Sequence, residues 1–296
     1  MSAVVNAMTD MRIAPDTARA TVSLRGTADQ VGLAEWLLHQ LDQPAPSSHQ
    51  PAVYEYRAGT PDSAVRVFRL ATVETPQGLN EVTAAIRAIA DLSRVRPYAA
   101  QRALVARGTP GQVALAEWLL DQLDQPASPV HESAAYDYQE AKLDPAVRVI
   151  RLAHIETRQD LQEIANAMRM IADVRKIPAD VVQGALVMRG TADQMALAEW
   201  LVDELDQPAG GKSSAALSQD PAADEFQVPG SDQIVHVFHF ADSTTAQQFV
   251  EIAAQARLAL KIETIHIYFS QRALLLRGTL DQIAATQQLI QETAKP

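Results

Sequence analysis

The triplet Arg-Gly-Thr occurs four times in this 296-residue chain, beginning at Arg25, Arg107, Arg189 and Arg277. The spacings are 82, 82 and 88 residues (107 − 25, 189 − 107 and 277 − 189). Ala-Glu-Trp-Leu and Leu-Asp-Gln-Pro follow each of the first three triplets at constant distances. A unit of this length is a small domain, because solenoid repeats span about 20–50 residues. Features that recur in every repeat specify a fold and its packing, whereas a catalytic constellation normally occurs once.

The second repeat is complete, and it predicts the order β-α-β-β-α. Residues 65–70 alternate apolar and polar side chains, which is typical of a strand with one buried face. A helix is expected to begin after Thr75, because threonine is a good N-cap and the next residue is proline. Residues 94–98 predict a short edge strand that contains a proline, and residues 103–106 predict a more buried strand that ends at Gly108.

A second helix follows each triplet, and a capping box marks its start. In such a box the threonine side chain and the glutamine side chain three residues later each bond a backbone N–H of the other. The four pairs are Thr27/Gln30, Thr109/Gln112, Thr191/Gln194 and Thr279/Gln282. The proline of Leu-Asp-Gln-Pro ends this helix, because a residue before proline is disfavoured in helical conformation.

The constant offsets divide the chain into segments. We predict the C-terminal part of a truncated repeat at 1–46, full repeats at 53–126 and 135–208, a flexible linker at 209–223 and a full divergent repeat at 224–296. The six extra residues of the last spacing fall in the linker, which contains glycine and serine. At the offset of 82 the chain begins inside a first helix, so we expect a truncated or mis-started piece of a longer protein. The first repeat should then have an open sheet edge.

We therefore predict an α+β fold made of tandem β-α-β-β-α modules, KH-like in element order, with two helices on one face of a short mixed sheet. The segments Val65–Ala71 and Ala103–Pro110, with a helix ending at Asp124, resemble the short N-terminal repeats of bacterial secretins. The resemblance extends over three full repeats and the partial one. It implies ring-building modules of the bacterial periplasm or cell envelope. Gln101 and Gln183 stand at a turn where that family usually carries asparagine.

Composition narrows the possible partners. The formal net charge is −11, and a field of that sign repels phosphate backbones, which argues against nucleic acid as a partner. The chain has no cysteine, so disulfides and thiolate metal sites are excluded. No apolar run approaches the roughly 18 residues that cross a bilayer, and no signal-peptide pattern is visible at the start.

The residues that could support chemistry lack the required spacing. Of the seven histidines, only His236 and His239 are close, and three residues apart on a strand they point to opposite faces. The segment Gly108–Gly111 matches the Gly-x-x-Gly loop of KH domains but lacks basic residues and is absent from the other repeats. No nucleophile elbow or phosphate loop is present. We expect no catalytic, cofactor or metal site.

The tryptophans are the candidate contact residues. On the second helix of the first repeat, at 100° per residue, Trp36 falls almost opposite the apolar stripe. The last repeat carries Gln288 at this position. If each tryptophan docks against the next module, the glutamine of the last repeat is explained, because no further module follows that repeat in this sequence. The alternative, that each tryptophan covers the edge of its own domain, does not explain the glutamine. The predicted contact set is Trp36, Trp118, Trp200, Tyr54, Tyr56, Tyr136 and Tyr138.

These observations favour a non-enzymatic scaffold or assembly protein of secretin-like repeats, acting in ring or envelope-complex assembly. Its partners would be copies of itself or other envelope proteins. The alternative is a tandem KH-like array that binds nucleic acid or a ligand, which the charge and the missing basic loops disfavour. An enzyme is the third possibility, and it would require a non-repeated polar cluster between modules.

Overall fold

The computed structural model describes residues 1–16, 18–19, 21–43, 51–57, 60–126, 131–154, 157–178, 184–207, 225–240 and 244–293. The predicted linker at 209–223 lies outside the described residues. Internal contacts group the chain into two compact units. The first unit comprises Met1–Ala127 and Tyr136–Lys142, and the second comprises Ser128–Ala135 and Leu143–Pro296.

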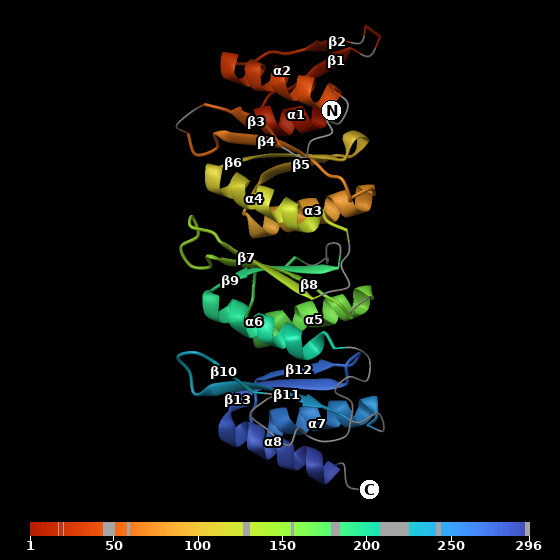
Figure 1. Ribbon diagram of the computed structural model, residues 1–296, viewed down its shortest axis with the longest axis vertical. Helices are drawn as coiled ribbons and strands as arrows, with labels where there is room; N and C mark the ends of the chain where they lie inside the picture. The colour runs from red at the N-terminus through yellow and green to blue at the C-terminus, as the bar shows by residue number, and fades with distance from the viewer. Residues whose placement is uncertain are drawn as a thin grey trace. The chain divides into compact units, whose positions relative to one another are not determined.

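The elements follow the predicted periodicity (Figure 1). The first unit contains α1 (Ser2–Thr9), β1 (Ala14–Asp16), β2 (Thr21–Ser23), α2 (Ala28–Asp42), β3 (Ala52–Glu55), β4 (Ala64–Arg69), α3 (Pro76–Ile89), β5 (Arg94–Tyr98), β6 (Ala103–Gly108) and α4 (Pro110–Leu123). β7 (Glu132–Asp137) begins the third repeat, followed by β8 (Ala146–Arg151), α5 (Arg158–Ile171), β9 (Ala185–Gly190) and α6 (Ala192–Leu205). The last repeat contains β10 (Glu225–Gln227), β11 (Gln233–His239), α7 (Ala246–Ala259), β12 (Thr264–Tyr268), β13 (Ala273–Thr279) and α8 (Leu280–Thr293).

The fold is α+β, with one small sheet in each repeat. The strand order is β3-β4-β6-β5 in the second repeat, β7-β8-β9 in the third and β10-β11-β13-β12 in the last. In the third repeat the described residues show an isolated bridge between Lys176 and Arg189 where β5 and β12 pair in the other two. The short strand β3, which contains Tyr54, pairs with β4. The edge position predicted for 94–98 is confirmed, since β5 is the outermost strand of its sheet.

The expectation of a mixed sheet was wrong. The ladders β4–β6 and β5–β6 are both antiparallel. A tight turn joins β5 to β6, so these two strands run in opposite directions. The crossover through α3 makes β4 and β5 parallel, but β6 lies between them and pairs with each. The last repeat has the same arrangement, with antiparallel pairing of β11 and β12 to β13.

Two helices cover one face of each full sheet, and the core lies between them and the sheet. In the second repeat α3 and α4 cover that face (Figure 1). The large apolar side chains of α3 are buried, as is the whole of β6. The last repeat has its own core, in which Phe238, Phe249, Ile265, Leu274 and Ile283 meet. Burying a side chain of this size contributes about 1.5–3 kcal/mol, so this core stabilises the last repeat.

The triplet has a local role that explains its glycine and threonine. Thr109 and Gln112 form the predicted capping box, with bonds of 3.1 Å in each direction. The Nε2 of Gln112 also donates to the carbonyl oxygen of Asp91, just after α3. A Cβ on Gly108 would lie 2.7 Å from the Oε1 of Gln112 and 2.5 Å from Leu92. The glycine therefore makes room for the glutamine side chain that ties the two helices together.

Candidate interface between repeats

In the first unit, the first repeat packs on the second. Helices α1 and α2 lie on the face of the β3-β4-β6-β5 sheet that α3 and α4 leave free (Figure 1). We call this contact the first joint. Its fully buried core contains Val4, Val5, Met8, Met11, Ile13, Leu33, Ala34, Leu37 and Leu41 from the first repeat with Tyr56, Val65, Val67, Ala103 and Val105 from the second. The β3-β4-β6-β5 sheet thus has one face for its own helices and one for the preceding repeat.

The arginine of the second triplet closes the first helix of the preceding repeat. Arg107 is 6% exposed, and its Nη1 donates to the carbonyl oxygen of Met8 at 2.5 Å. That carbonyl belongs to the last turn of α1, where helical carbonyls lack partners. Arg94 joins the contact through an ion pair with Asp10 at 2.6 Å. Beneath the guanidinium lies the ring of Tyr56, whose centroid is 4.0 Å from the Arg107 Cζ.

A glutamine and a second arginine donate hydrogen bonds to carbonyl oxygens at the end of α2. The Nε2 of Gln101 donates to the carbonyl oxygen of Leu41 at 2.6 Å. Arg69 donates from Nη2 to the carbonyl oxygen of Gln40 at 2.5 Å and also bonds the side chain of Gln101. Gln101 precedes Arg102, which has a left-handed backbone with φ 47°. The turn at Gln101 is therefore a contact point between repeats.

In the second unit, the third repeat packs on the last one in the same manner. We call this contact the last joint. Arg277 of the fourth triplet donates from Nη1 to the carbonyl oxygen of Ile171, at the end of α5, at 3.3 Å. Gln271, equivalent to Gln101, donates to the carbonyl oxygen of Gln207 at 3.2 Å. Its buried core combines residues of α5 and α6 with Val235, Val237, Tyr268, Ala273 and Leu275 of the last sheet.

Each tryptophan lies against an aromatic ring beyond its own helix. The ring centroids of Trp36 and Tyr54 are 5.1 Å apart with an interplanar angle of 41°. Trp118 and Tyr136 repeat this geometry at 5.1 Å and 40°. Trp200 contacts Phe226 at 5.6 Å and 43°. Tilted pairs at these distances are attractive beyond the area they bury. The partner ring always follows the repeat that carries the tryptophan.

Tyr56 and Tyr138, the other two tyrosines of the predicted contact set, have different neighbours. Tyr56 is 2% exposed and lies within the first joint, under Arg107. Tyr138 is 5% exposed, and its hydroxyl donates to Glu140 at 3.2 Å. The tyrosines that stack on Trp36 and Trp118 are Tyr54 and Tyr136.

The last joint also contains histidines that face carboxylates. His239 on β11 lies 4.0 Å from Glu204 on α6, at the position that Arg69 and Gln40 take in the first joint. His266 on β12 lies near Glu163 of α5; burial lowers its pKa below 6.5, and the charge of Glu163 partly opposes this shift. Burial, with a smaller contribution from neighbouring carboxylates, raises the pKa of Tyr268. The Nε2 of His266 is buried without a hydrogen-bond partner among the described residues.

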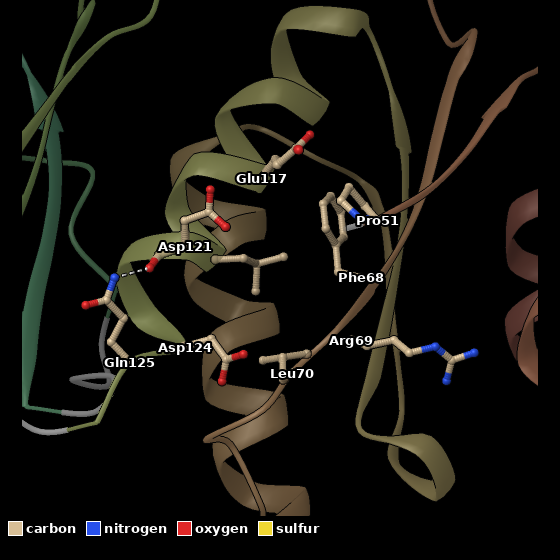
Figure 2. Close-up of a pocket in the computed structure, with 9 residues that line it drawn as sticks. Pro51, Phe68, Arg69, Leu70, Glu117, Asp121, Asp124 and Gln125 are labelled. Atoms are coloured by element: carbon tan, nitrogen blue, oxygen red, sulfur yellow. Dashed lines mark hydrogen bonds between the residues drawn. The ribbon is translucent and has the colours of Figure 1, made fainter. Parts of the chain in front are cut away.

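The close-up in Figure 2 shows a pocket on the second repeat, with a volume of about 320 Å³. Two of its three carboxylates, those of Asp124 and Glu117, have partners in the structure. Asp124 accepts hydrogen bonds from the backbone N–H of Ala71 at 2.6 Å and of Thr72 at 2.7 Å. Glu117 lies 3.9 Å from Arg66, and Figure 2 shows Arg69 pointing away from the carboxylates.

Metal ligands and membrane-spanning helices are both absent from the part of the chain that the structure describes. Among those residues, no group of three or more histidine, aspartate or glutamate side chains is placed to hold a metal ion. No helix formed by the described residues is both long enough and apolar enough to cross a membrane.

The arginines and the glutamine turn were not among the contact residues expected from the sequence. The Arg-Gly-Thr triplet was interpreted as a strand end and a helix start, which explains only its last two residues. A signal was available, because an arginine at the end of the buried strand in each full repeat needs a hydrogen-bond acceptor. The acceptor could not be named from the sequence, since Met8 and Arg107 are separated by 99 residues.

Comparison with known proteins gives a likeness to secretins. No family model and no curated protein matches this chain. Among solved structures, it is similar to the N-terminal domain of the secretin XcpQ from Pseudomonas aeruginosa, with 20% identity over 69% of this chain and 91% of that one, at a TM-score of 0.22. Aeromonas hydrophila ExeD matches with 15% identity over 77% of this chain and 40% of that one, at 0.17. GspD in the pilotin–secretin complex AspS–GspD of ETEC matches with 13% identity over 78% and 38%, at 0.19.

Proposed function

We propose that this protein is a non-enzymatic scaffold whose tandem repeats present surfaces for protein–protein interaction in an envelope assembly. The observation that carries the proposal is the use of the recurring polar residues. The arginine of the triplet holds the preceding repeat at Met8 in the first joint and at Ile171 in the last. The threonine and glutamine form the cap. Groups that are engaged in capping and stacking are unavailable for chemistry.

The alternative of a KH-like nucleic-acid array finds no support at its candidate loop. The side chain of Glu140 accepts hydrogen bonds from the Thr109 hydroxyl at 2.5 Å and from the Gly111 backbone N–H at 2.9 Å. A carboxylate therefore sits where a KH loop would hold a phosphate group. Together with the net charge of −11, this favours a protein partner over a polyanion.

Oligomeric state and crosslinking test the proposal. We expect the full chain to enter a protein complex, with itself or another envelope protein, seen by sedimentation velocity and by photo-crosslinking from Leu258, which is 81% exposed on α7. The double variant Arg107→Ala with Arg277→Ala should weaken that complex, because it loosens both joints. Arg25→Ala is the matched control, since Arg25 is exposed. A wild-type chain that stays monomeric and forms no crosslink would contradict the proposal.

A further inference from the structure

The outermost strand of the last sheet, β12, has an edge that no described strand pairs. β12 pairs with β13 on its other side. Its equivalent in the second repeat is β5, where Val95 holds the position of Ile265. The carbonyl oxygen of Val95 points away from its sheet, because it accepts a hydrogen bond of 3.2 Å from Arg87 on α3. By the same register, the N–H and C=O groups of Ile265 and Ile267 point outward from β12.

The second repeat protects this edge, whereas the last repeat lacks the same protection. Pro97, at the position of Ile267, has no N–H to donate. Arg87 covers the carbonyl oxygen of Val95 in addition. Prolines and covering cations keep edge strands from pairing with other chains. In the last repeat Ile267 carries an N–H, and Arg257, the counterpart of Arg87, makes no hydrogen bond with β12 among those of the described residues.

An apolar stripe on α7 flanks the β12 edge. α7 packs beside β12 (Figure 1). Val250 is 52% exposed and Leu258 is 81% exposed, and Ala254 between them is exposed as well. At about 100° per residue these three side chains fall within an arc of about 80°, and Val250 lies about 20° from Arg257. Because Arg257 stands where Arg87 reaches the β5 edge, the stripe begins on the edge side of the helix. We call the outward edge of β12 with Val250, Ala254 and Leu258 the lateral surface.

The exposure of the stripe does not depend on whether another repeat follows. The equivalent positions on α3 and α5 are exposed too, and on α5 this holds although the last repeat packs on that helix. Among the three full repeats, α7 alone has apolar residues at all three positions. α3 carries Asn80, Ala84 and Ala88, and α5 carries Gln162, Asn166 and Met170. The lateral surface is therefore a feature of the last repeat itself.

The lateral surface is complementary to a copy of itself. Two β12 edges that pair antiparallel around His266 place Ile265 of one copy opposite Ile267 of the other, so that each outward N–H meets a C=O. Two α7 helices that run antiparallel around Ala254 place Val250 of one copy opposite Leu258 of the other. The small side chain of Ala254 at the centre lets the two helices approach closely.

One two-fold axis can serve the strand and the helix together, because the two centres lie at nearly the same level of the repeat. At one end, the rings of Phe249 on α7 and Phe269 after β12 have centroids 6.4 Å apart. At the other end, Arg257 stands at the level of Ile265, as Arg87 does at the level of Val95. The point midway between these ends falls within about one residue of Ala254 on α7 and of His266 on β12.

We propose that the lateral surface joins two copies of this chain as a two-fold dimer, through antiparallel pairing of the β12 edges and contact of the α7 stripes. A two-fold interface sets one patch against the same patch of the second copy, and here the strand edge and the apolar stripe share one axis. The inference rests on the proposed function, since it assigns one protein contact of the scaffold to a second copy.

Self-association of the purified full chain tests the proposal. We expect a monomer–dimer equilibrium in sedimentation velocity. Leu258→Asp should raise the dissociation constant about tenfold or more, because it places a charge in an apolar contact. Ile267→Pro should have a similar effect, because it gives β12 the proline that blocks the β5 edge. Ala88→Asp is the matched control, since it changes the equivalent exposed position of α3 and should leave the dissociation constant unchanged.

Single cysteines test the register, because the chain has no cysteine of its own. With a short thiol crosslinker, Ala254→Cys alone should give a covalent dimer. In a mixture, Val250→Cys chains should crosslink to Leu258→Cys chains more than either crosslinks to itself. Crosslinking of Leu258→Cys chains chiefly to one another would overturn the antiparallel arrangement.

Two further results would overturn the proposal: a wild-type chain that stays monomeric at every soluble concentration, or equal dissociation constants for Leu258→Asp and Ala88→Asp. Circular dichroism of each variant checks that it is folded, and the exposed position of Leu258 keeps that test independent of the core. A monomeric chain that still crosslinks from Leu258 to another envelope protein would leave the scaffold proposal intact, so the two proposals fail separately.

Discussion

The guanidinium of Arg107 donates a hydrogen bond to the carbonyl oxygen of Met8 at 2.5 Å, which joins the end of a buried strand in one repeat to the end of a helix in the repeat before it. Arg277 and Ile171 form the same relationship in the second unit. The joint therefore uses a charged donor for a carbonyl that the helix itself leaves unpaired. This contact makes the stacking of repeats specific in register, beyond the apolar contact of helix and sheet.

Replacing Arg107 by alanine should lower the free energy of unfolding of the full chain by about 2–3 kcal/mol, because Met8 loses a charge-assisted partner inside a buried contact. Urea denaturation followed by circular dichroism measures the change. Arg25→Ala removes the same residue type from the exposed equivalent position, and it should change stability by less than about 0.5 kcal/mol. Equal effects of the two variants would mean that the hydrogen bond from Arg107 to Met8 contributes nothing to the free energy of unfolding.

The ring contact of Trp36 and Tyr54 should be energetically coupled. In a double-mutant cycle with Trp36→Ala and Tyr54→Ala, we expect a coupling energy of about 0.5–1.5 kcal/mol, because tilted aromatic pairs attract beyond the area they bury. Chemical denaturation of the four proteins gives this value. A cycle between Trp36 and Tyr136, whose ring partner is Trp118, should be additive. Additivity of Trp36 with Tyr54 would restore the interpretation that the tryptophan only covers its own domain.

Gly108→Ala should destabilise the second repeat by about 1–3 kcal/mol, because the new Cβ would overlap the packed side chain of Leu92 and the cap glutamine. Gly26→Ala should cost less. Its added Cβ would meet the cap glutamine Gln30 at 2.9 Å and otherwise only the flexible end of Met11, which can move. The difference in thermal midpoint between the two variants checks this order. A larger loss for Gly26→Ala would contradict it.

Acidification should weaken the last joint through His266. Burial lowers the pKa of this imidazole below its ordinary value of 6.5, so the unfolded state binds more protons at low pH. The resulting stability is full above 6.5 and falls as the pH drops from 6.5 towards the lowered pKa. His266→Gln stays neutral, so its free energy of unfolding should vary less than that of the wild type between about pH 5 and pH 7.5. His39→Gln changes an exposed histidine and should keep the wild-type pH dependence. Identical profiles for all three proteins would exclude this role.

The sequence alone determined the features that depend on near neighbours. The period of the repeats, the capping boxes and the strand at 103–108 follow from residues a few positions apart, because a cap bond joins side chain and backbone three residues away. The alternating pattern of 65–70 likewise placed β4. The proposed contact role of the tryptophans came from their angle on the helix, which is also a local property.

Only the tertiary structure decided the order of the strands in each sheet and the hydrogen-bond acceptors of the arginines. The insertion of β6 between β4 and β5 depends on which edges pair after the crossover, and local periodicity is the same for a mixed and an antiparallel sheet. The acceptor of Arg107 is 99 residues away, at a helix end brought there by the packing of one repeat on the next.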